Sequence, residues 1–497
     1  MKWRKSASIL LTAAMVCSMF TAVPVSADNS AGESFAGLEQ YEAPVITNVF
    51  DRISVHTHGS SIVQLPDGEL LCVWFQGDGE RKSNVGRIMA SRKLPGGEWQ
   101  EPFVIADTPG MPDINPNIYL DENDRLWLFW YPVLANQWES SQPKFKYADK
   151  GHYESANGYT TEPDWDWQEI MYPTPGDDFV GGAISVDANG VAQYRIKGDT
   201  IKYLTEEQFS RWENKDDPTA YVKVEDRYIT DSFVVSMNNG YMDAVDYVKN
   251  SGLYDANPLK DALVGLLEKT ASSTAAVASG ATNNWKKWNP TFRRIGWQTK
   301  NKPLEIEVNG HTRLLLPLYA DQFAASIMAY SDDNGKTWQY SDVIAAMGDI
   351  QAATVQKEDG TLRSYFRSAE PSGYLVYHES TDYGETWGGV QVETQLRHVG
   401  GFDIVKLPTG EWVMAITETI EDATEKTDNR ARLNIAVSKD EGETWEITPL
   451  REDLTGKSSY HYAAITVGNE DTIYVSYSYD DPDGTNNIQV AEFELKA

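Results

Sequence analysis

The stretch Ser331-Asp332-Asp333-Asn334-Gly335-Lys336-Thr337-Trp338 occurs three times in related form. The later copies begin at Ser380 and Ser438, and all three follow the pattern Ser-x-Asp-x-Gly-x-Thr-Trp. The aspartate can accept hydrogen bonds from its own turn, the glycine can adopt a positive φ, and the tryptophan can anchor the turn to a core. The copies start roughly 50 residues apart, and hairpin repeats of that length are typical of a β-propeller.

A second repeated unit is a turn of Asp, Gly, Pro or Asn residues followed by an apolar strand. A turn followed by β-branched and aromatic residues is typical of a hairpin. Six such units predict an all-β protein with six propeller blades. The six turns are Gln64 to Gly68, Asp121 to Asp124, Val308 to Gly310, Glu358 to Gly360, Pro408 to Gly410 and Asn469 to Asp471.

The interval between the second and third turns is too long for one blade, so we expect an insertion over residues 150–285. Within it, Gly240 to Ser272 carries valine and leucine at helical spacing, with a break near Pro258. Ser272 to Asn284 is rich in Ala and Ser and is expected to be a linker. The insertion is either a cap packed on one propeller face or a lid over a substrate cleft. A seventh blade near Val180 to Tyr203 is the alternative to six.

The three octets resemble the Asp-boxes, also called BNR repeats, of the sialidase superfamily. The resemblance implies a sialidase-like propeller over residues 45–149 and 286–497. Asp-boxes in that superfamily are turns away from the active face. They therefore indicate the fold and not the chemistry.

The N-terminus has the composition of a secretory signal. Lys2, Arg4 and Lys5 precede an apolar run over residues 6–23, and Val25-Ser26-Ala27 is a small-residue cleavage site. We expect residues 1–27 to be removed and the protein to be secreted. A membrane anchor is the alternative, but the apolar run is short for a span.

The composition excludes several classes of partner and cofactor. The net charge of −31 disfavours binding to nucleic acid and to anionic membranes. Only Cys72 lies beyond the expected signal, so no disulfide framework is expected. His56 and His58 would share one face of a strand, but no third metal ligand is evident, and no cofactor is expected.

The resemblance also implies where site residues lie. Sialidases hold, at one mouth of the channel, three arginines for the substrate carboxylate, a tyrosine nucleophile with a glutamate partner, and an aspartate acid. By position in the repeats, His58 replaces the first arginine, Gln351 replaces the glutamate, Arg367 matches the second arginine, and Tyr462 matches the tyrosine. Asp78 is the candidate acid, with Glu80 second, and the third arginine stays open between Arg293, Arg294 and Arg430.

This set departs from sialidase chemistry at two positions. A tyrosine nucleophile needs a carboxylate to take its proton, and Gln351 cannot do so. His58, Arg367 and Tyr462 instead suit β-elimination on a uronic acid, in which a neutral histidine takes a proton and a tyrosine gives one. The set resembles the propeller lyases acting on ulvan and on rhamnosyl-glucuronate ends. Each residue also has a structural interpretation, as channel lining, ion pair or packing.

Three more residues flank the insertion and are expected to bind sugar. Trp297 can stack on a sugar ring, Arg294 can bind its oxygens, and Lys302 precedes a strand that should start at the channel mouth. The alternative for Trp297 is a place in the core. The sequence thus predicts a secreted enzyme that cleaves a glycosidic bond at a terminal acidic sugar or uronate, and possible lyase chemistry by β-elimination. An exo-sialidase-type hydrolase and a catalytically silent glycan-binding propeller are the alternatives.

Overall fold

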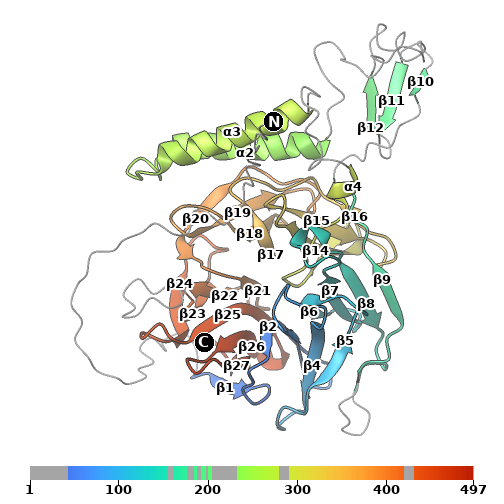
Figure 1. The fold of residues 1–497 in the computed structure, drawn as a ribbon, viewed down its shortest axis with the longest axis vertical. Coiled ribbons are helices and arrows are strands. Elements are labelled where there is room, and N and C mark those ends of the chain that lie inside the picture. Colours follow the sequence, from blue (N-terminus) through green and yellow to red (C-terminus); the bar gives the residue numbers. More distant parts are fainter. Residues whose placement is uncertain are drawn as a thin grey trace, which may run out of the picture.

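Six four-stranded antiparallel sheets surround a central axis (Figure 1). They confirm the expected all-β propeller of six blades. The structure is a computed structural model that describes residues 43–154, 162–175, 184–186, 192–196, 200–203, 232–278, 290–418 and 430–495. The expected signal, residues 1–27, lies outside the described residues.

The blades are numbered in chain order and described from the inner to the outer strand. The first contains β2 (His56–Gln64), β3 (Leu70–Gly77), β4 (Arg87–Lys93) and β5 (Phe103–Ala106). The second contains β6 (Asp113–Leu120), β7 (Leu126–Pro132), β8 (Lys144–Ala148) and β9 (Trp167–Ile170). The third contains β13 (Leu304–Val308), β14 (His311–Ala320), β15 (Ala325–Ser331) and β16 (Gln339–Tyr340).

The other three blades follow without interruption. The fourth contains β17 (Ile350–Gln356), β18 (Leu362–Arg367), β19 (Tyr374–Ser380) and β20 (Gln391–Arg397). The fifth contains β21 (Phe402–Lys406), β22 (Trp412–Glu418), β23 (Arg432–Ser438) and β24 (Glu446–Glu452). The sixth contains β25 (Ser459–Val467), β26 (Ile473–Asp480), β27 (Asn486–Phe493) and, from the N-terminal side, β1 (Val45–Asn48).

The six repeated turns have one common place in the fold. Each joins the inner strand of a blade to its second strand. The ring closes in the sixth blade, where β1 pairs antiparallel with β27, from Val45 opposite Glu492 to Asn48 opposite Gln489. Backbone hydrogen bonds between the two ends of the chain therefore close the propeller.

The Asp-boxes join the third and fourth strands of the third, fourth and fifth blades. In the fourth blade, Asp382 Oδ1 accepts hydrogen bonds from Ser380 Oγ at 2.7 Å and from Thr386 N at 2.9 Å, and its Oδ2 accepts one from Thr386 Oγ1 at 2.6 Å. Burial alone would raise the pKa of Asp382, but the hydrogen bonds from Thr386 and Ser380 lower it. The carboxylate thus holds the turn together.

The glycine of each box lies against the preceding blade. At Gly335 (φ 78°), an added Cβ would lie 2.4 Å from Trp127 Cη2 of the second blade. At Gly442 (φ 84°), it would lie 2.4 Å from the Tyr365 hydroxyl of the fourth blade. The repeated glycine is therefore required both by its backbone and by contact between blades.

We expect Asp382→Ala to lower the free energy of unfolding by about 1–3 kcal/mol, because it leaves three donors of the turn without their acceptor. Denaturant unfolding of the full chain measures this. Asp382→Asn keeps one acceptor oxygen and should cost less. Equal stability of the alanine variant and the unchanged protein would contradict the structural role of the box.

The insertion follows the second blade. Its fourth strand β9 lies inside the range 150–285 expected for the insertion and pairs with β8, so the part outside the blades begins after Ile170. A three-stranded sheet of β10 (Ile184–Val186), β11 (Ala192–Ile196) and β12 (Thr200–Tyr203) lies apart from the ring, and no seventh blade forms there (Figure 1).

Two helices make up the rest of the described insertion, α2 (Ser232–Asn250) and α3 (Lys260–Ala278), separated by a turn that contains Pro258. The expected helical spacing with a break near Pro258 agrees with these two helices, although α2 begins earlier than Gly240, at Ser232. The expected linker starting at Ser272 is helical up to Ala278, because Ala and Ser do not interrupt a helix that packs on a neighbour. A short helix, α4 (Pro290–Arg293), leads into the third blade.

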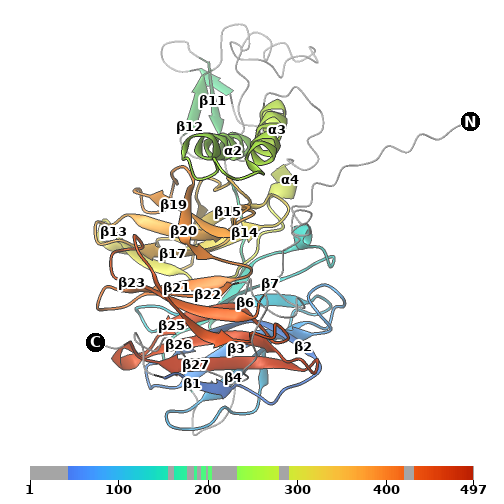
Figure 2. The same cartoon turned by 90° about the vertical axis from the view of Figure 1, so that its left-hand side faces the viewer.

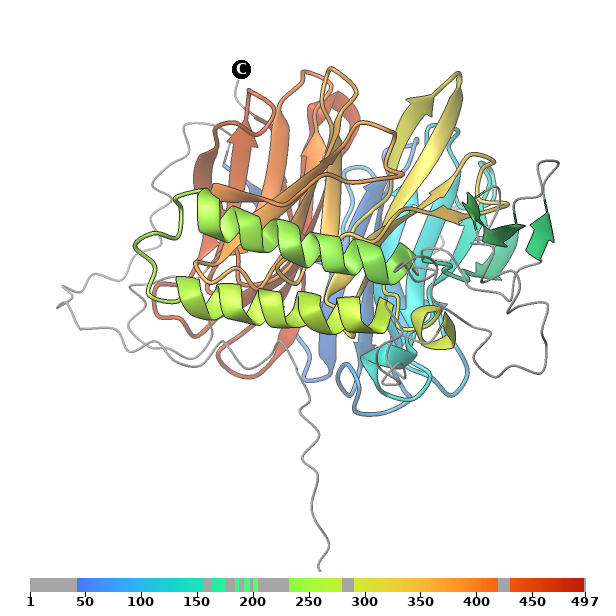
Figure 3. The same cartoon turned by 90° about the horizontal axis from the view of Figure 1, so that it is seen from above.

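The helices do not cover the channel. They lie side by side against the outer edge of the third and fourth blades, outside the ring (Figures 1, 2 and 3). At Gly240 of α2, an added Cβ would lie 1.7 Å from the Ala345 carbonyl oxygen, so α2 contacts the loop between β16 and β17 directly. Tyr254 OH donates to Glu370 Oε1 at 2.9 Å. The lid hypothesis is therefore wrong.

Among the described helices, none has both the length and the apolar character that crossing a membrane requires.

Candidate active site

The inner strands of four blades are interrupted by a β-bulge. In each bulge one residue has a left-handed backbone, namely Gly59 (φ 63°), Asn115 (φ 43°), Gln351 (φ 55°) and Tyr462 (φ 46°). A bulge re-aims the side chain that follows the break in pairing, and strained backbone of this kind gathers at functional sites. The side chains of Asn115, Gln351 and Tyr462 all line one cavity.

This cavity has a volume of about 310 Å³ and receives residues from the strands or loops of all six blades and from the connection before the third. Its lining is mainly polar and ionisable. The lining residues are His58, Glu80, Asn115, Tyr131, Trp138, Gln298, Tyr319, Asp321, Ile350, Gln351, Arg367, Arg430 and Tyr462.

Four residues carried over from the sialidase pattern meet here. The rings of His58 and Tyr462 contact edge to face, with centroids 4.5 Å apart. Gln351 Nε2 donates to Tyr462 OH at 3.1 Å, and Arg367 NH1 donates to Gln351 Oε1 at 3.4 Å. His58, Tyr462, Gln351 and Arg367 thus form one continuous chain of contacts.

The orientation of the Gln351 amide follows from its partners. Arg367 has only donors, so the amide oxygen must face Arg367. The amide nitrogen then faces the hydroxyls of Tyr462 at 3.1 Å and Tyr319 at 3.4 Å. Tyr462 oxygen accepts a hydrogen bond from Gln351, which leaves its own O–H hydrogen available to a substrate. Gln351 therefore cannot take the proton of Tyr462.

Of the three arginines left open by the sequence, Arg430 lines the cavity. Arg430 NH1 lies 2.6 Å from His461 Nδ1, which must be the acceptor because a guanidinium has none. The ring proton is then on His461 Nε2, 3.1 Å from Asp480 Oδ2 and 2.9 Å from Ser459 Oγ. Asp480 and Ser459 therefore orient His461, and His461 orients Arg430.

The carboxyl groups that line the cavity do not include Asp78, the acid expected from the sequence. Asp78 is exposed and does not line the cavity, whereas Glu80, the second candidate, does. Glu80 Oε1 lies 3.9 Å from His58 Nε2, and desolvation raises the pKa of Glu80. Asp321, in the loop between β14 and β15, also lines the cavity. Desolvation raises the pKa of Asp321, although the hydrogen bond from Gln298 acts to lower it. Nothing in the repeats pointed to Asp321.

Three other expected sugar-binding residues lie elsewhere. Trp297 is 0% exposed and donates to the Arg293 carbonyl oxygen at 2.6 Å, so it belongs to the core and cannot stack on a sugar. Lys302 donates to Asp403 Oδ2 at 2.7 Å and does not line the cavity. Arg294 follows α4 and does not line it either.

A buried lysine, Lys300, lies beside Tyr462. Lys300 Nζ is 5.3 Å from the centre of the Tyr462 ring and donates to Asn301 Oδ1 at 3.2 Å. Burial lowers the pKa of Lys300 to about 8. At Gly401, an added Cβ would lie 2.6 Å from Tyr462 Cδ1 and 3.1 Å from Lys300 Cε, so this glycine makes room for both side chains.

Two buried histidines near the cavity are uncharged near neutral pH. Burial, with the neighbouring His461, His56 and Arg430 acting in the same direction, holds the pKa of His58 well below 6.5. Burial and the charge of Arg367 lower the pKa of His398 to about 3, and His398 Nε2 accepts a hydrogen bond from Ser368 N at 3.3 Å. His58 therefore has an unprotonated ring nitrogen, whereas the lone pair of His398 Nε2 is already used by Ser368 N.

His398 makes a testable contribution to stability. Its folded pKa is lowered, so the unfolded chain takes up a proton below pH 6.5 that the folded chain refuses, and stability is lost as the pH falls. Between pH 7 and pH 5 we expect the unchanged protein to lose about 2 kcal/mol more unfolding free energy than His398→Gln, which has no such proton. Urea unfolding at both pH values measures this, and parallel losses would contradict it.

Within the described residues, no three His, Cys, Asp or Glu side chains are placed to hold a metal ion.

Comparison with known families identifies the fold family. The family described as "BNR repeat-like domain" matches residues 68–169 and 280–475, more than half of the chain. The chain belongs to this family. The BNR repeat-like match omits most of the insertion and includes the second to fifth blades, three strands of the first blade and part of the sixth. Together with the sialidase relatives below, it makes the chain a propeller of the sialidase superfamily.

Individual relatives are similar over limited parts. A sialidase of Micromonospora viridifaciens is 25% identical over 213 residues, which is 40% of this chain and 31% of that protein. An anhydrosialidase of Macrobdella decora is 38% identical over 77 residues, 15% of this chain and 10% of that protein. This BNR repeat-like chain thus spans less than a third of either curated relative.

A solved structure extends the likeness of fold. A protein of unknown function from Dyadobacter fermentans has a TM-score of 0.53 and 12% identity, over 91% of this chain and 98% of that one. At that identity the likeness shows the fold alone.

Proposed function

We propose that this BNR repeat-like propeller cleaves a glycosidic bond at a terminal acidic sugar or uronate of a glycan, by β-elimination. The observation that carries the proposal is the contact chain of His58, Tyr462, Gln351 and Arg367, with Arg430 in the same cavity. It combines groups that bind a carboxylate with groups that exchange protons. The expected secretory signal supports action on a glycan outside the cell.

The two arginines supply the first requirement of an elimination. Arg367 and Arg430 both line the cavity, and a sugar carboxylate bound there would receive charge-assisted hydrogen bonds. Neutralising the carboxylate makes the neighbouring C5–H bond more acidic. Gln351, held by Arg367, presents its amide hydrogens to the same space.

The histidine and the tyrosine supply the two proton transfers. His58 is uncharged near neutrality and accepts the C5 proton. The C5–H electron pair forms the C4=C5 double bond as the C4–O bond breaks. The leaving oxygen then takes the hydroxyl proton of Tyr462, which Gln351 leaves free. His58 and the tyrosinate afterwards exchange the proton through solvent, so no water is added to the sugar.

Hydrolysis is a second candidate because of Glu80. Its raised pKa favours the protonated form that a general acid requires, and it lies in the loop where the resemblance implies the acid. In this case a water molecule would be the nucleophile, and Asp321 is the carboxylate in the cavity that can activate it. The relatives named sialidase and anhydrosialidase add support for action on a sugar acid.

The experiment is a screen of the purified full chain against acidic polysaccharides and sialylated oligosaccharides. New reducing ends together with ultraviolet absorbance of an unsaturated sugar would support elimination. Reducing ends or free sialic acid without that absorbance would support hydrolysis and overturn the elimination. Binding without any cleavage across the panel would favour the silent glycan-binding propeller.

A further inference from the structure

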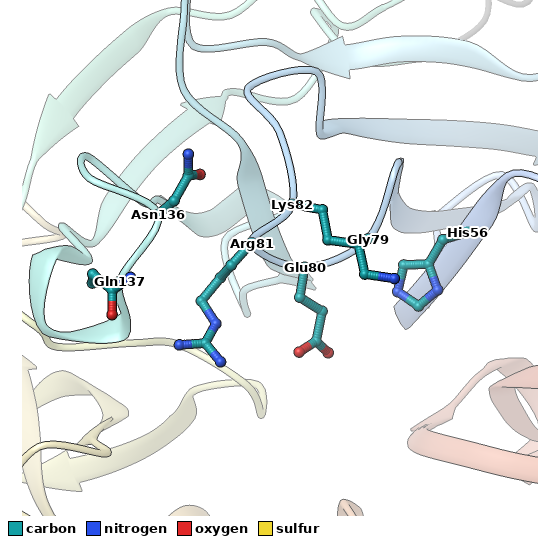
Figure 4. Close-up of a pocket in the computed structure, with 7 residues that line it drawn as sticks. All are labelled: His56, Gly79, Glu80, Arg81, Lys82, Asn136 and Gln137. Atoms are coloured by element: carbon teal, nitrogen blue, oxygen red, sulfur yellow. The ribbon is translucent and has the colours of Figure 1, made fainter. Parts of the chain in front are cut away.

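A second cavity adjoins the first at the side of the β3–β4 loop. It has a volume of about 540 Å³ and is lined by His56, Gly79, Glu80, Arg81, Lys82, Asn136 and Gln137 (Figure 4). Glu80 lines both cavities, so the two cavities adjoin at this side chain. The mechanism above uses none of the other six residues.

The charge of this cavity opposes that of the protein. The chain carries a net charge of −31, yet Arg81 and Lys82 face this space and Glu80 is the one acid among the lining residues. Arg81 is held in place by Trp138, whose ring centre lies 4.5 Å from its guanidinium carbon. Lys82 extends toward His56 (Figure 4). An exposed pair of cations beside a substrate cavity suits an anionic ligand.

The wall also contains buried polar atoms that need a partner. His56 Nε2 and Asn136 Oδ1 have no hydrogen-bond partner among the described residues. Burial, aided by the charge of Lys82, lowers the pKa of His56, so the ring is neutral near pH 7. Buried polar atoms without partners are uncommon in folded proteins; both atoms are closed to solvent here, so a sugar hydroxyl could pair with them only after the wall shifts.

Gly79 supports the position of Lys82. Its φ of 122° is one that side-chain-bearing residues rarely adopt, and an added Cβ would lie 3.0 Å from Lys82 Cδ. The lysine stem therefore packs against the glycine backbone, with its ammonium group at the end nearest His56 (Figure 4).

We propose that the second cavity is a subsite for the neighbouring sugar of the same glycan, with Arg81 and Lys82 binding an anionic substituent of that sugar, a carboxylate or a sulfate ester. The proposal rests on the proposed function for the direction of the chain from one cavity to the next. It makes the preferred substrate an oligosaccharide that is acidic at two consecutive residues.

Calorimetric binding tests the subsite separately from catalysis. The full chain carrying Tyr462→Phe is titrated with glucuronic acid, with a uronic acid disaccharide, and with a disaccharide in which a sulfate ester replaces the second carboxylate. The same titrations use this chain with Arg81→Ala and Lys82→Ala added. A matched control instead adds Lys336→Ala and Lys439→Ala, which remove two exposed cations from Asp-box turns on the opposite face.

We expect Arg81→Ala with Lys82→Ala to weaken binding of at least one disaccharide by about 10- to 100-fold, the usual worth of one or two charged hydrogen bonds, and to leave glucuronic acid unaffected. The disaccharide that responds identifies the anion as carboxylate or sulfate. Unchanged binding of both disaccharides would overturn the subsite, as would an equal loss in the Lys336 and Lys439 control. If the unchanged protein cleaves neither disaccharide and Arg81→Ala with Lys82→Ala still weakens disaccharide binding selectively, the subsite is upheld and the proposed elimination fails.

Discussion

Tyr462→Phe is expected to lower kcat on an acidic glycan by about 10²- to 10⁴-fold, the usual worth of general acid help, with little change in KM. The substitution removes the hydroxyl hydrogen that Gln351 leaves free and keeps the ring that contacts His58. Initial rates at several substrate concentrations separate the two constants.

Gln351→Ala provides the comparison for Tyr462→Phe. The amide donates to Tyr462 and holds Arg367, so its removal should raise KM and lower kcat less than Tyr462→Phe does. Release of sialic acid that is unchanged in Gln351→Ala and abolished in Tyr462→Phe would instead support a tyrosine nucleophile. Full activity of Tyr462→Phe would remove the tyrosine from the mechanism.

His58→Ala is expected to cost about 10²-fold or more in kcat, because the His58 ring contacts Tyr462 and burial keeps it uncharged as a base near neutral pH. His58→Gln keeps polarity and much of the volume and should be equally impaired, which separates basicity from packing. His152→Ala, an exposed histidine with a salt bridge to Asp166, is the control and should have full activity.

The pH profile adds a second criterion for His58. Since burial lowers the pKa of His58, protonation should reduce the rate only well below pH 6.5. An acid limb centred at or above pH 6.5 would contradict a buried neutral base. A fully active His58→Ala enzyme would remove His58 from the mechanism altogether.

Much of the fold could be predicted because the blades repeat. The six turns that follow the inner strands and the three Asp-boxes report both the number of blades and their register. The position of the helices could not be predicted in this way. Their contact with the propeller edge depends on single features such as Gly240 against the Ala345 carbonyl, and no repeat encodes those.

The site residues show the same contrast between repeated segments and irregular ones. His58, Gln351, Arg367 and Tyr462 are at fixed offsets from the turns of regular blades, so counting along the repeats located them. Five of the cavity residues lie outside the blade strands: Glu80 and Asp321 in loops, Gln298 in the connection before the third blade, Trp138 in the short helix η2 (Trp138–Ser140), and Arg430 just after residues outside the described part. Sequence offsets do not determine which side chain of a loop points inward, so the resemblance, which implies an aspartate in this loop, indicates Asp78 where the structure has Glu80 at the cavity.

The β-bulges of the inner strands determine a further feature that could not be predicted, the direction in which side chains point there. A regular strand would direct alternate side chains toward and away from the channel, and the left-handed residues at Asn115, Gln351 and Tyr462 change that alternation. Of these, only Asn115 is a residue type that readily adopts such a backbone, so residue type does not predict the left-handed conformation of Gln351 and Tyr462.

The origin of the product oxygen tests the elimination most directly. The full chain is incubated with an acidic oligosaccharide that it cleaves, in water enriched in heavy oxygen, and both products are weighed by mass spectrometry. Elimination predicts products whose masses add up to that of the substrate, with an unsaturated sugar and no heavy oxygen incorporated during cleavage. Heavy oxygen fixed at the anomeric carbon of a saturated sugar, with the mass of one water gained, would contradict the account and assign hydrolysis.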